Sequence, residues 1–334
     1  GASEPLLRIR QPRGEGAVRP APPEQVRDDE QQLPIQEDET ALVLVALEHY
    51  HRKYGMIEFI QQLFHPLILP MGDWMARFVD GKTGLPLPTY DLWEEQRGIF
   101  SYTVATTYAG LIAGACLAEA TGHLDTGSRY REAAEGIRSA MLKHLFSPEH
   151  NRFLKKVTLQ DGIITERDAT VDASLAFVWK MGVLPPDDKR IRSTMQAIHE
   201  LLTVLGPIGG IARYQNDNYH FDWDTTSHNE FTGNPWLITT LWEADYIIET
   251  ATSGRDLAAA QRILRWVAQR ATSAGILPEQ VHPVSGAHLS VSPLTWSHAT
   301  LLATVVRYVE KFTQLKAEHD AAQPAWREER FVRF

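Results

Sequence analysis

The stretch that decides the fold is FSYTVATTYAGLIAGACLAEAT, which runs from Phe100 to Thr121. Its apolar residues occupy nearly the whole circumference of a helix, and they are Val104, Tyr108, Leu111, Ile112, Ala115 and Leu117. A helix that is apolar nearly all round is buried on most of its sides. The sequence therefore predicts a central buried helix over about 100–121, with other helices packed around it.

Eight further segments show helical spacing of apolar residues. We expect helices at about 38–54, 56–80, 125–146, 171–181, 188–205, 235–252, 255–274 and 294–315. Pro66 and Pro70 should bend or break the second of these. Buried-looking helices alternate with amphipathic ones, which is typical of a two-layer ring. The predicted class is all-α with nine helices and no central strands, apart from one small hairpin around Asp161-Gly162.

Composition limits the function classes. The chain has 334 residues, with 33 Lys and Arg against 42 Asp and Glu, so its net charge of −9 argues against a nucleic-acid binder. No run approaches the roughly 20 apolar residues that cross a bilayer, so we expect no membrane partner. The single cysteine, Cys116, excludes an intramolecular disulfide and a thiolate metal cluster. No basic-then-apolar leader follows Gly1, which predicts a cytoplasmic protein.

The segment GLPLPTYDLWEEQRG, residues 84–98, is the densest in chemically useful side chains. It places three carboxylates beside Tyr90 and Trp93. A carboxyl group packed against an aromatic face loses hydration, which favours the neutral form and suits a proton donor. The alternative is a helix N-terminus at which Glu94 and Glu95 only complement the helix dipole.

Two other loops carry polar groups. Glu279 lies in an apolar, proline-bounded loop with no nearby Lys or Arg, so it is either functional or a surface glutamate. Arg213 and Asp217 lie among aromatic residues, which suits sugar hydroxyls or a structural ion pair. In a helical ring these loops would converge at one mouth. Two opposed carboxyl groups are the minimum machinery for glycoside hydrolysis.

The chain resembles the family 15 glycoside hydrolases, the glucoamylases, glucodextranases and trehalases. The matching stretches are LPIQEDETA (33–41), TGLPLPTYDLWEEQRG (83–98), ARYQND (212–217), GNPW (233–236), PEQ (278–280) and LTWSHA (294–299). The resemblance implies an (α/α)6 toroid-type barrel that is incomplete, because about nine of its twelve helices have counterparts here. It implies a catalytic domain over 31–316, after an extended proline-rich segment over 1–30 and before a polar tail over 317–334.

The resemblance also implies an inverting, exo-acting hydrolase that releases glucose from α-glucan chain ends or disaccharides. Glu94 would be the general acid and Glu279 the general base. Substrate-binding residues would be Tyr90, Asp91, Trp93, Glu95, Arg213, Asp217, Trp236 and Trp296. Within that set Arg213 and Asp217 would hold the terminal sugar, Trp93 and Trp296 would form its walls, and Glu95 would face the leaving group. We expect no cofactor and no metal, since the spacing of His282, His288 and His298 matches no ligand motif.

Several alternatives stay open. The absence of three helices would expose apolar flanks of the helices at 38–54 and 294–315. A missing N-terminal segment or a second copy in a homo-oligomer would cover these flanks. The absence of the helices would also weaken the activity, so a non-catalytic carbohydrate-binding or regulatory domain, or a scaffold for protein partners, competes with the enzyme. Asp168 and Asp172 are interpreted as helix caps. Trp242 and Trp266 are interpreted as packing residues.

Overall fold

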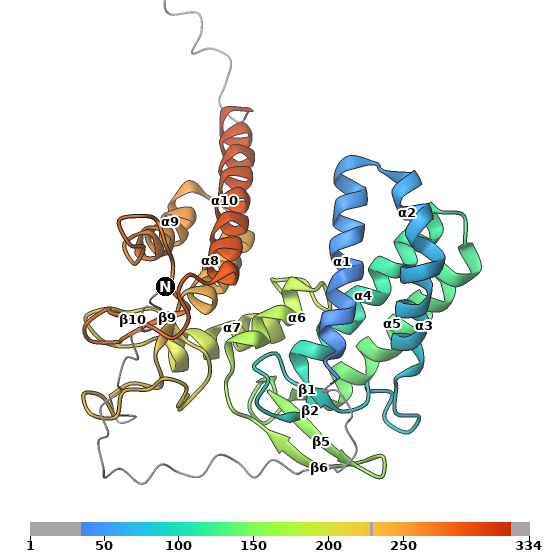
Figure 1. Ribbon diagram of the computed structural model, residues 1–334, viewed down its shortest axis with the longest axis horizontal. Helices are drawn as coiled ribbons and strands as arrows, with labels where there is room; N and C mark the ends of the chain where they lie inside the picture. Colours follow the sequence, from blue (N-terminus) through green and yellow to red (C-terminus); the bar gives the residue numbers. More distant parts are fainter. Residues whose placement is uncertain (1–34, 228–229, 322–334) are drawn as a thin grey trace, which may run out of the picture. The chain divides into compact units, whose positions relative to one another are not determined.

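The computed structural model describes residues 35–227 and 230–321, which lie in one compact unit beginning at Ile35 (Figure 1). The proline-rich segment expected over 1–30 lies outside the described residues. Within them the helices are α1 (Glu37–Tyr54), α2 (Ile57–Leu63), α3 (Leu69–Arg77), α4 (Ser101–Ala120), α5 (Leu124–His144), α6 (Phe177–Lys180), α7 (Lys189–Leu202), α8 (Leu237–Thr250), α9 (Gly254–Ala268) and α10 (Thr295–Ala321). The all-α class is confirmed.

The central helix is the predicted one. α4 is buried over most of its length and packs between α1 and α5. Among the described residues, α4 is also long and apolar enough to span a membrane by length and composition. Its threonines and glycines interrupt the apolar residues, so it contains no uninterrupted apolar run of that length. Since 67% of that window is buried inside the protein, it has the character of a core helix.

The contact between α1 and α4 depends on a glycine. A Cβ atom on Gly110 would lie 2.8 Å from the Cα of Ala41, closer than side chains approach a backbone. We expect Gly110→Ala to cost about 1–3 kcal/mol of unfolding free energy, as overpacked cores do. Gly136→Ala on α5, where a Cβ meets nothing within 4 Å, should instead stabilise by about 0.5–1 kcal/mol. Urea unfolding of both variants tests this, and equal effects would contradict it.

The prolines act as expected in the second helical segment. Between α2 and α3 the residues Phe64–Ile68 form a π-helical turn that contains Pro66, and Pro70 lies in the first turn of α3. Because Pro66 has no N–H to donate, the regular ladder of the α-helix is interrupted there.

The segment predicted as a helix over 171–181 is shorter in the structure. Asp172 forms a β-bridge with Tyr214, a 3-10 turn follows at Ala173–Ala176, and α6 covers four residues. The backbone of 171–173 is already bonded to the Arg213 segment, so it is not free to enter a helix. At the other end of the chain α10 continues to Ala321, through the first residues of the expected polar tail.

Short strands join the loops, which the sequence did not predict beyond one hairpin. That hairpin, β5 (Lys156–Gln160) and β6 (Ile163–Asp168), turns at Asp161-Gly162, both with positive φ. It belongs to a sheet of order β1-β2-β5-β6, with β1 (Thr89–Tyr90) and β2 (Arg97–Phe100). A second sheet, β10-β9-β8-β7, contains β7 (Ile211–Ala212), β8 (Pro235–Trp236), β9 (Gln280–Val281) and β10 (His288–Leu289). A third pairs β3 (Phe146–Ser147) with β4 (Arg152–Phe153).

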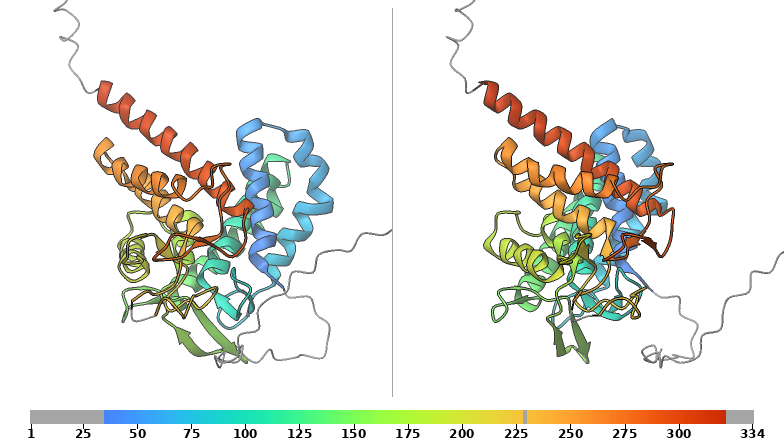
Figure 2. Two further views of the ribbon diagram at one scale, coloured as in Figure 1. Left: turned by 60° about the vertical axis from the view of Figure 1, so that its left-hand side comes forward. Right: turned by 90° about the vertical axis from the view of Figure 1, so that its left-hand side faces the viewer.

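The last helices form their own packed group. α8 packs on both α9 and α10, and both views of Figure 2 show α10 in red running alongside α9 in orange. One face of α10 remains open to solvent, and its large apolar side chains are Leu302, Val305, Val306, Val309 and Phe312. On α1 the exposed ones are Val43, Tyr50 and Tyr54. The predicted exposure of apolar flanks on the first and last helices is therefore confirmed.

The first turn of α1 makes stability depend on pH. Burial raises the pKa of the Asp38 carboxyl from 3.8 to about 6 against the opposing hydrogen bond from Thr103. Since the folded chain then binds this proton more tightly than the unfolded chain, stability falls as pH rises from about 4 to about 6. We expect Asp38→Asn to remove up to about 3 kcal/mol of that fall. Urea unfolding at several pH values measures it, and an unchanged slope in the variant would contradict it.

Candidate active site

The Glu94 loop is a tight turn between β1 and β2. The buried carboxylate of Asp91 accepts the amide N–H groups of Glu95 and Gln96 at 2.8 and 2.9 Å, and Glu94 donates its N–H to the Asp91 carbonyl. Burial raises the pKa of Asp91. Its Oδ2 atom is buried without a partner among the described residues. The turn ends before α4 begins at Ser101, so the helix-dipole interpretation of Glu94 and Glu95 is wrong.

Trp93 and Glu94 project to opposite environments. The Trp93 indole is buried, 5.7, 6.1 and 6.3 Å from the ring centroids of Trp236, Trp242 and Trp296. Glu94 is exposed and has a φ of 58°, in the left-handed region. Because Glu94 is exposed, the prediction that an aromatic face removes water from its carboxyl is not borne out among the described residues.

Arg213 is the centre of a buried polar cluster. Its Nε and Nη2 donate to the Asp217 carboxylate at 2.9 and 2.7 Å, and Nη2 also donates to Glu95 at 2.6 Å. The Tyr214 hydroxyl donates to the other Glu95 oxygen at 2.6 Å. Burial alone would lower the pKa of Arg213, but hydrogen bonds and charge from Asp217 outweigh it and raise the pKa. The predicted pairing of Arg213 with Asp217 is present, and Glu95 joins it.

Aromatic rings surround this guanidinium. It lies 4.7–5.2 Å from four ring centroids, those of Trp93, Tyr214, Tyr219 and Trp236. The electron-rich faces of aromatic rings attract a cation, so they stabilise this guanidinium beside its carboxylate acceptors. The cluster therefore offers flat apolar surfaces beside a rigid set of donors and acceptors, which is the combination that sugar rings require.

The second sheet connects Glu279 to the residues around Arg213. Trp236 pairs with Gln280 across β8 and β9, and the Glu279 carbonyl accepts the Leu237 amide at 3.2 Å. The Glu279 side chain is half-buried, and the Gln280 amide donates to its Oε2 at 3.5 Å. Trp236 therefore links the loops: its backbone pairs with Gln280 beside Glu279, and its ring contacts Trp93 of the Glu94 loop. The separation of the Glu94 and Glu279 carboxyl groups stays a prediction.

Comparison with known proteins decides the family. The model of the glycosyl hydrolases family 15 matches residues 21–257, more than half of the chain. The chain belongs to glycosyl hydrolase family 15.

Its relatives are glycosidases of greater length. An uncharacterized glycosyl hydrolase of Methanocaldococcus jannaschii is 29% identical over 281 residues, covering 81% of this chain and 42% of that protein. The trehalase of Mycobacterium tuberculosis is 29% identical over 227 residues, covering 66% and 30%. A bacterial glucoamylase complexed with acarbose superimposes with a TM-score of 0.68 at 23% identity, covering 83% and 41%. The fold is thus an incomplete (α/α)6 barrel, and the chain spans about two fifths of the first and last of these relatives.

Two predicted site residues of this family 15 member lie outside the centre of the cluster. Tyr90 has an exposed ring on the edge strand β1, and its amide donates to the Ile35 carbonyl. Trp296 is half-buried at the start of α10, beside Trp93 and Trp242. The structure therefore brings Trp93, Glu95, Arg213, Asp217 and Trp236 into direct contact, with Trp296 at their edge.

The histidines considered as metal ligands bond to the backbone instead. His282 accepts the Ser285 amide, His288 donates to the Arg270 carbonyl and His298 accepts the Leu277 amide. Across residues 35–227 and 230–321 no group of three His, Cys, Asp or Glu side chains could hold a metal ion.

The predicted site residues are contacted by Tyr219, Tyr214 and Asp172, and Tyr214 in turn by Lys155, none of which was predicted as part of the site. Tyr214 follows Arg213 directly in the matched ARYQND string, which was the available signal. Asp172 does cap the turn after it, as predicted, by accepting the Ser174 amide at 2.8 Å, but it also accepts the Trp93 indole N–H at 3.0 Å. Lys155, its ion-pair partner, belongs to no motif. Asp168 is not a cap: it ends β6 and accepts the Thr170 amide.

The two tryptophans interpreted as packing residues do pack. Trp242 lies in the buried core with its ring 4.8 Å from that of Phe177. Trp266 on α9 packs in a smaller apolar cluster and donates its indole N–H to the Ile208 carbonyl.

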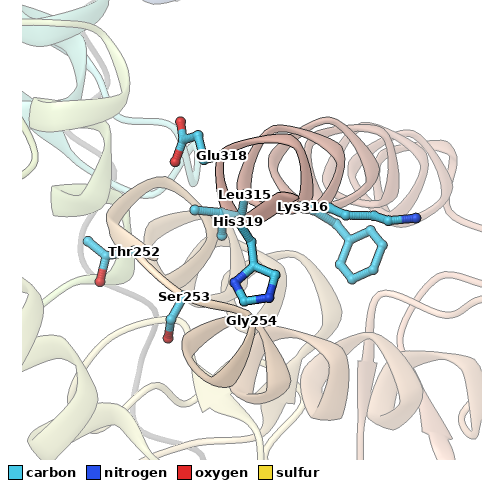
Figure 3. Close-up of a pocket in the computed structure, with 8 residues that line it drawn as sticks. Thr252, Ser253, Gly254, Leu315, Lys316, Glu318 and His319 are labelled. Carbon is cyan, nitrogen blue, oxygen red and sulfur yellow. The ribbon is translucent and has the colours of Figure 1, made fainter. Parts of the chain in front are cut away.

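A surface pocket of about 510 Å³ lies away from these residues (Figure 3). It is formed by the start of α9 and the last turns of α10, and its lining is Thr252, Ser253, Gly254, Phe312, Leu315, Lys316, Glu318 and His319. None of the predicted site residues lines it. Ser253 caps α9 by accepting the Asp256 amide, so its side chain already has a structural role there.

Proposed function

We propose that this family 15 glycosidase hydrolyses α-glucosidic bonds at chain ends or in disaccharides and releases glucose with inversion. The observation that supports it best is the Arg213–Asp217–Glu95 cluster, ringed by aromatic side chains and lying between the Glu94 and Glu279 loops. The trehalase and glucoamylase relatives support the same substrate class.

The proposed chemistry uses two carboxyl groups. Glu94 protonates the leaving glycosidic oxygen, while Glu279 takes a proton from the water that attacks the opposite face of the sugar. Inversion requires carboxyl groups about 6.5–9.5 Å apart, so that this water fits between base and sugar. The Gln280 amide beside Glu279 Oε2 orients that carboxylate to accept the proton.

Sugar recognition is assigned to the buried cluster. Glu95, which is partly exposed, accepts hydrogen bonds from sugar hydroxyls, and the buried Asp217 holds the Arg213 guanidinium that fixes Glu95 in place. Trp296, which is half-buried, provides a flat surface for the apolar face of the glucosyl ring, and the Trp93 indole packs beside it. Asp91 acts indirectly, since its carboxylate shapes the turn that carries Glu94 and Glu95.

Product analysis tests the proposal. The chain is incubated with maltose, isomaltose and trehalose, and the anomeric protons of released glucose are followed by NMR before mutarotation. An initial excess of β-glucose from maltose or isomaltose, or equal amounts of α- and β-glucose from trehalose, supports the proposal, and the preferred disaccharide identifies the linkage. Saturable binding of these sugars without turnover would instead favour the non-catalytic carbohydrate-binding alternative.

We further propose that additional helical polypeptide covers the open faces of α1 and α10. Leu302 and Phe312 are 67% and 49% exposed, although monomeric proteins rarely leave such a row of large apolar side chains in water. Sedimentation of the chain, together with the binding of a hydrophobic dye, distinguishes a missing covering segment from a second copy of the chain. A monomer that binds the dye supports a missing covering segment, whereas a stable dimer that excludes the dye would show that a second copy covers the faces.

A further inference from the structure

A buried ion pair lies directly behind the predicted substrate wall. Lys155 and Asp172 are 4% and 0% exposed, and Lys155 Nζ lies 3.2 Å from Asp172 Oδ2. Removing two charges from water costs several kcal/mol per ion, so such a pair needs good geometry and further hydrogen bonds to persist. The contacts of this pair therefore indicate what it holds in place.

Asp172 joins two loops that are far apart in sequence. Its Oδ2 atom accepts the indole N–H of Trp93 from the Glu94 loop, and its Oδ1 atom caps the turn at Ser174. Its backbone bridges to Tyr214, and the next amide, of Ala173, donates to the Arg213 carbonyl at 2.9 Å. One residue thus fixes the Trp93 side chain relative to the segment that carries Arg213, directly after β7.

Lys155 extends the connection. Its ammonium lies 3.9 Å from the centroid of the Tyr214 ring, and the Tyr214 hydroxyl donates to Glu95. The ammonium is therefore shared between the Asp172 carboxylate and an aromatic face, an arrangement that stabilises a desolvated cation. The ion pair is thus connected to Trp93 directly and to Glu95 through Tyr214, and these two residues flank Glu94 in the sequence.

Glu94 needs such support. Its left-handed backbone costs about 1–2 kcal/mol for a residue with a side chain. Strained conformations persist only where the surroundings over-determine them. The Asp91 carboxylate constrains the turn on the Glu95 side, and the Asp172 carboxylate constrains it through the Trp93 indole.

We propose that Asp172, held by Lys155, is a positioning residue that fixes the Trp93 indole and thereby the orientation of Glu94. The catalytic consequence of this inference rests on the proposed function. The positioning of Trp93 by Asp172 rests only on the hydrogen bond between them. The competing explanation is that Asp172 only caps the turn and neutralises Lys155.

The double variant Lys155→Met/Asp172→Ser separates the two explanations. It removes both buried charges together, and serine still caps the turn, but its short side chain does not reach the indole. Asp188→Ser is the matched control, because Asp188 also caps a helix and also pairs with a cation, Arg190, away from the site. The Trp93 indole signal in 1H–15N NMR is assigned from its loss in Trp93→Phe.

In the double variant we expect the Trp93 indole proton to shift upfield and kcat to fall about 10- to 100-fold with little change in KM, as slight misplacement of a catalytic group does. Asp188→Ser should change neither. An unmoved indole signal, or a kcat like that of the control, would overturn the proposal. If the unmodified chain releases no glucose, the proposed function fails, and the indole signal alone then decides this inference.

A measurement on the unmodified protein covers the case in which the double variant does not fold. Hydrogen exchange of the assigned Trp93 indole N–H should be slowed at least about tenfold relative to the urea-unfolded chain, because the proton is bonded to a buried carboxylate. Exchange as fast as in the unfolded chain would overturn the proposal.

Discussion

Replacing Glu279 by glutamine should lower kcat by about 10²–10⁴-fold, the usual contribution of a general base. Glutamine preserves the shape of the side chain and its contact with Gln280, but it cannot take a proton from water. Initial rates of glucose release from the preferred disaccharide measure the loss. Glu149→Gln, an exposed glutamate in a distant turn, removes the same charge and should leave the rate unchanged.

Glu94→Gln should cause a loss of similar size with a different signature. An α-glucosyl fluoride has a leaving group that needs little protonation, so the variant without its acid should keep much of its activity on that substrate. Glu279→Gln should remain inactive on both substrates, because the attacking water still needs a base. Near-normal turnover of disaccharides by Glu279→Gln would remove the assignment of the base.

The second large effect is expected on stability. Arg213→Met should destabilise the fold by about 3–5 kcal/mol, because it leaves the Asp217 carboxylate buried without its partner. Arg131→Met is the control, since Arg131 forms a comparably short pair with Glu119 at the surface, where such pairs contribute about 1 kcal/mol or less.

Urea unfolding of the two arginine variants measures the difference. Arg213→Met/Asp217→Leu should recover part of the loss, because the double change removes the stranded charge as well as the cation. If Arg213→Met were no less stable than Arg131→Met, the cluster would be solvated and would not form the rigid sugar site proposed above.

The helices were predictable because their signals are local. Continuous apolar character of 100–121 required burial on all sides, and Pro66 required an interruption of the second helix. The hairpin followed from Asp161-Gly162, two residues that tolerate the positive φ of a tight turn. Such features depend on nearest neighbours and on period, which a single sequence contains.

The parts that could not be predicted depend on tertiary context. Strands β7 to β10 have two residues each, too few to show any alternation. Lys155 lies in no motif, and only the folded chain shows that its ammonium is buried against Asp172. The exposed Glu94 has a left-handed φ of 58°, and nothing in the string WEE predicts that backbone conformation.

The division of the strands between two sheets has a mechanical consequence. Glu94 is carried by the β1–β2 turn, whereas Arg213, Trp236 and Glu279 adjoin strands of the β7–β10 sheet. The proposed general acid and general base are therefore carried by different sheets, and among the described residues the Glu94 loop is joined to the Arg213 segment by side-chain hydrogen bonds from Arg213 and Tyr214 to Glu95. We therefore expect the distance between the two proposed catalytic carboxyl groups to depend on these side-chain bonds and on the Trp93–Asp172 hydrogen bond, and to change when any of them is removed.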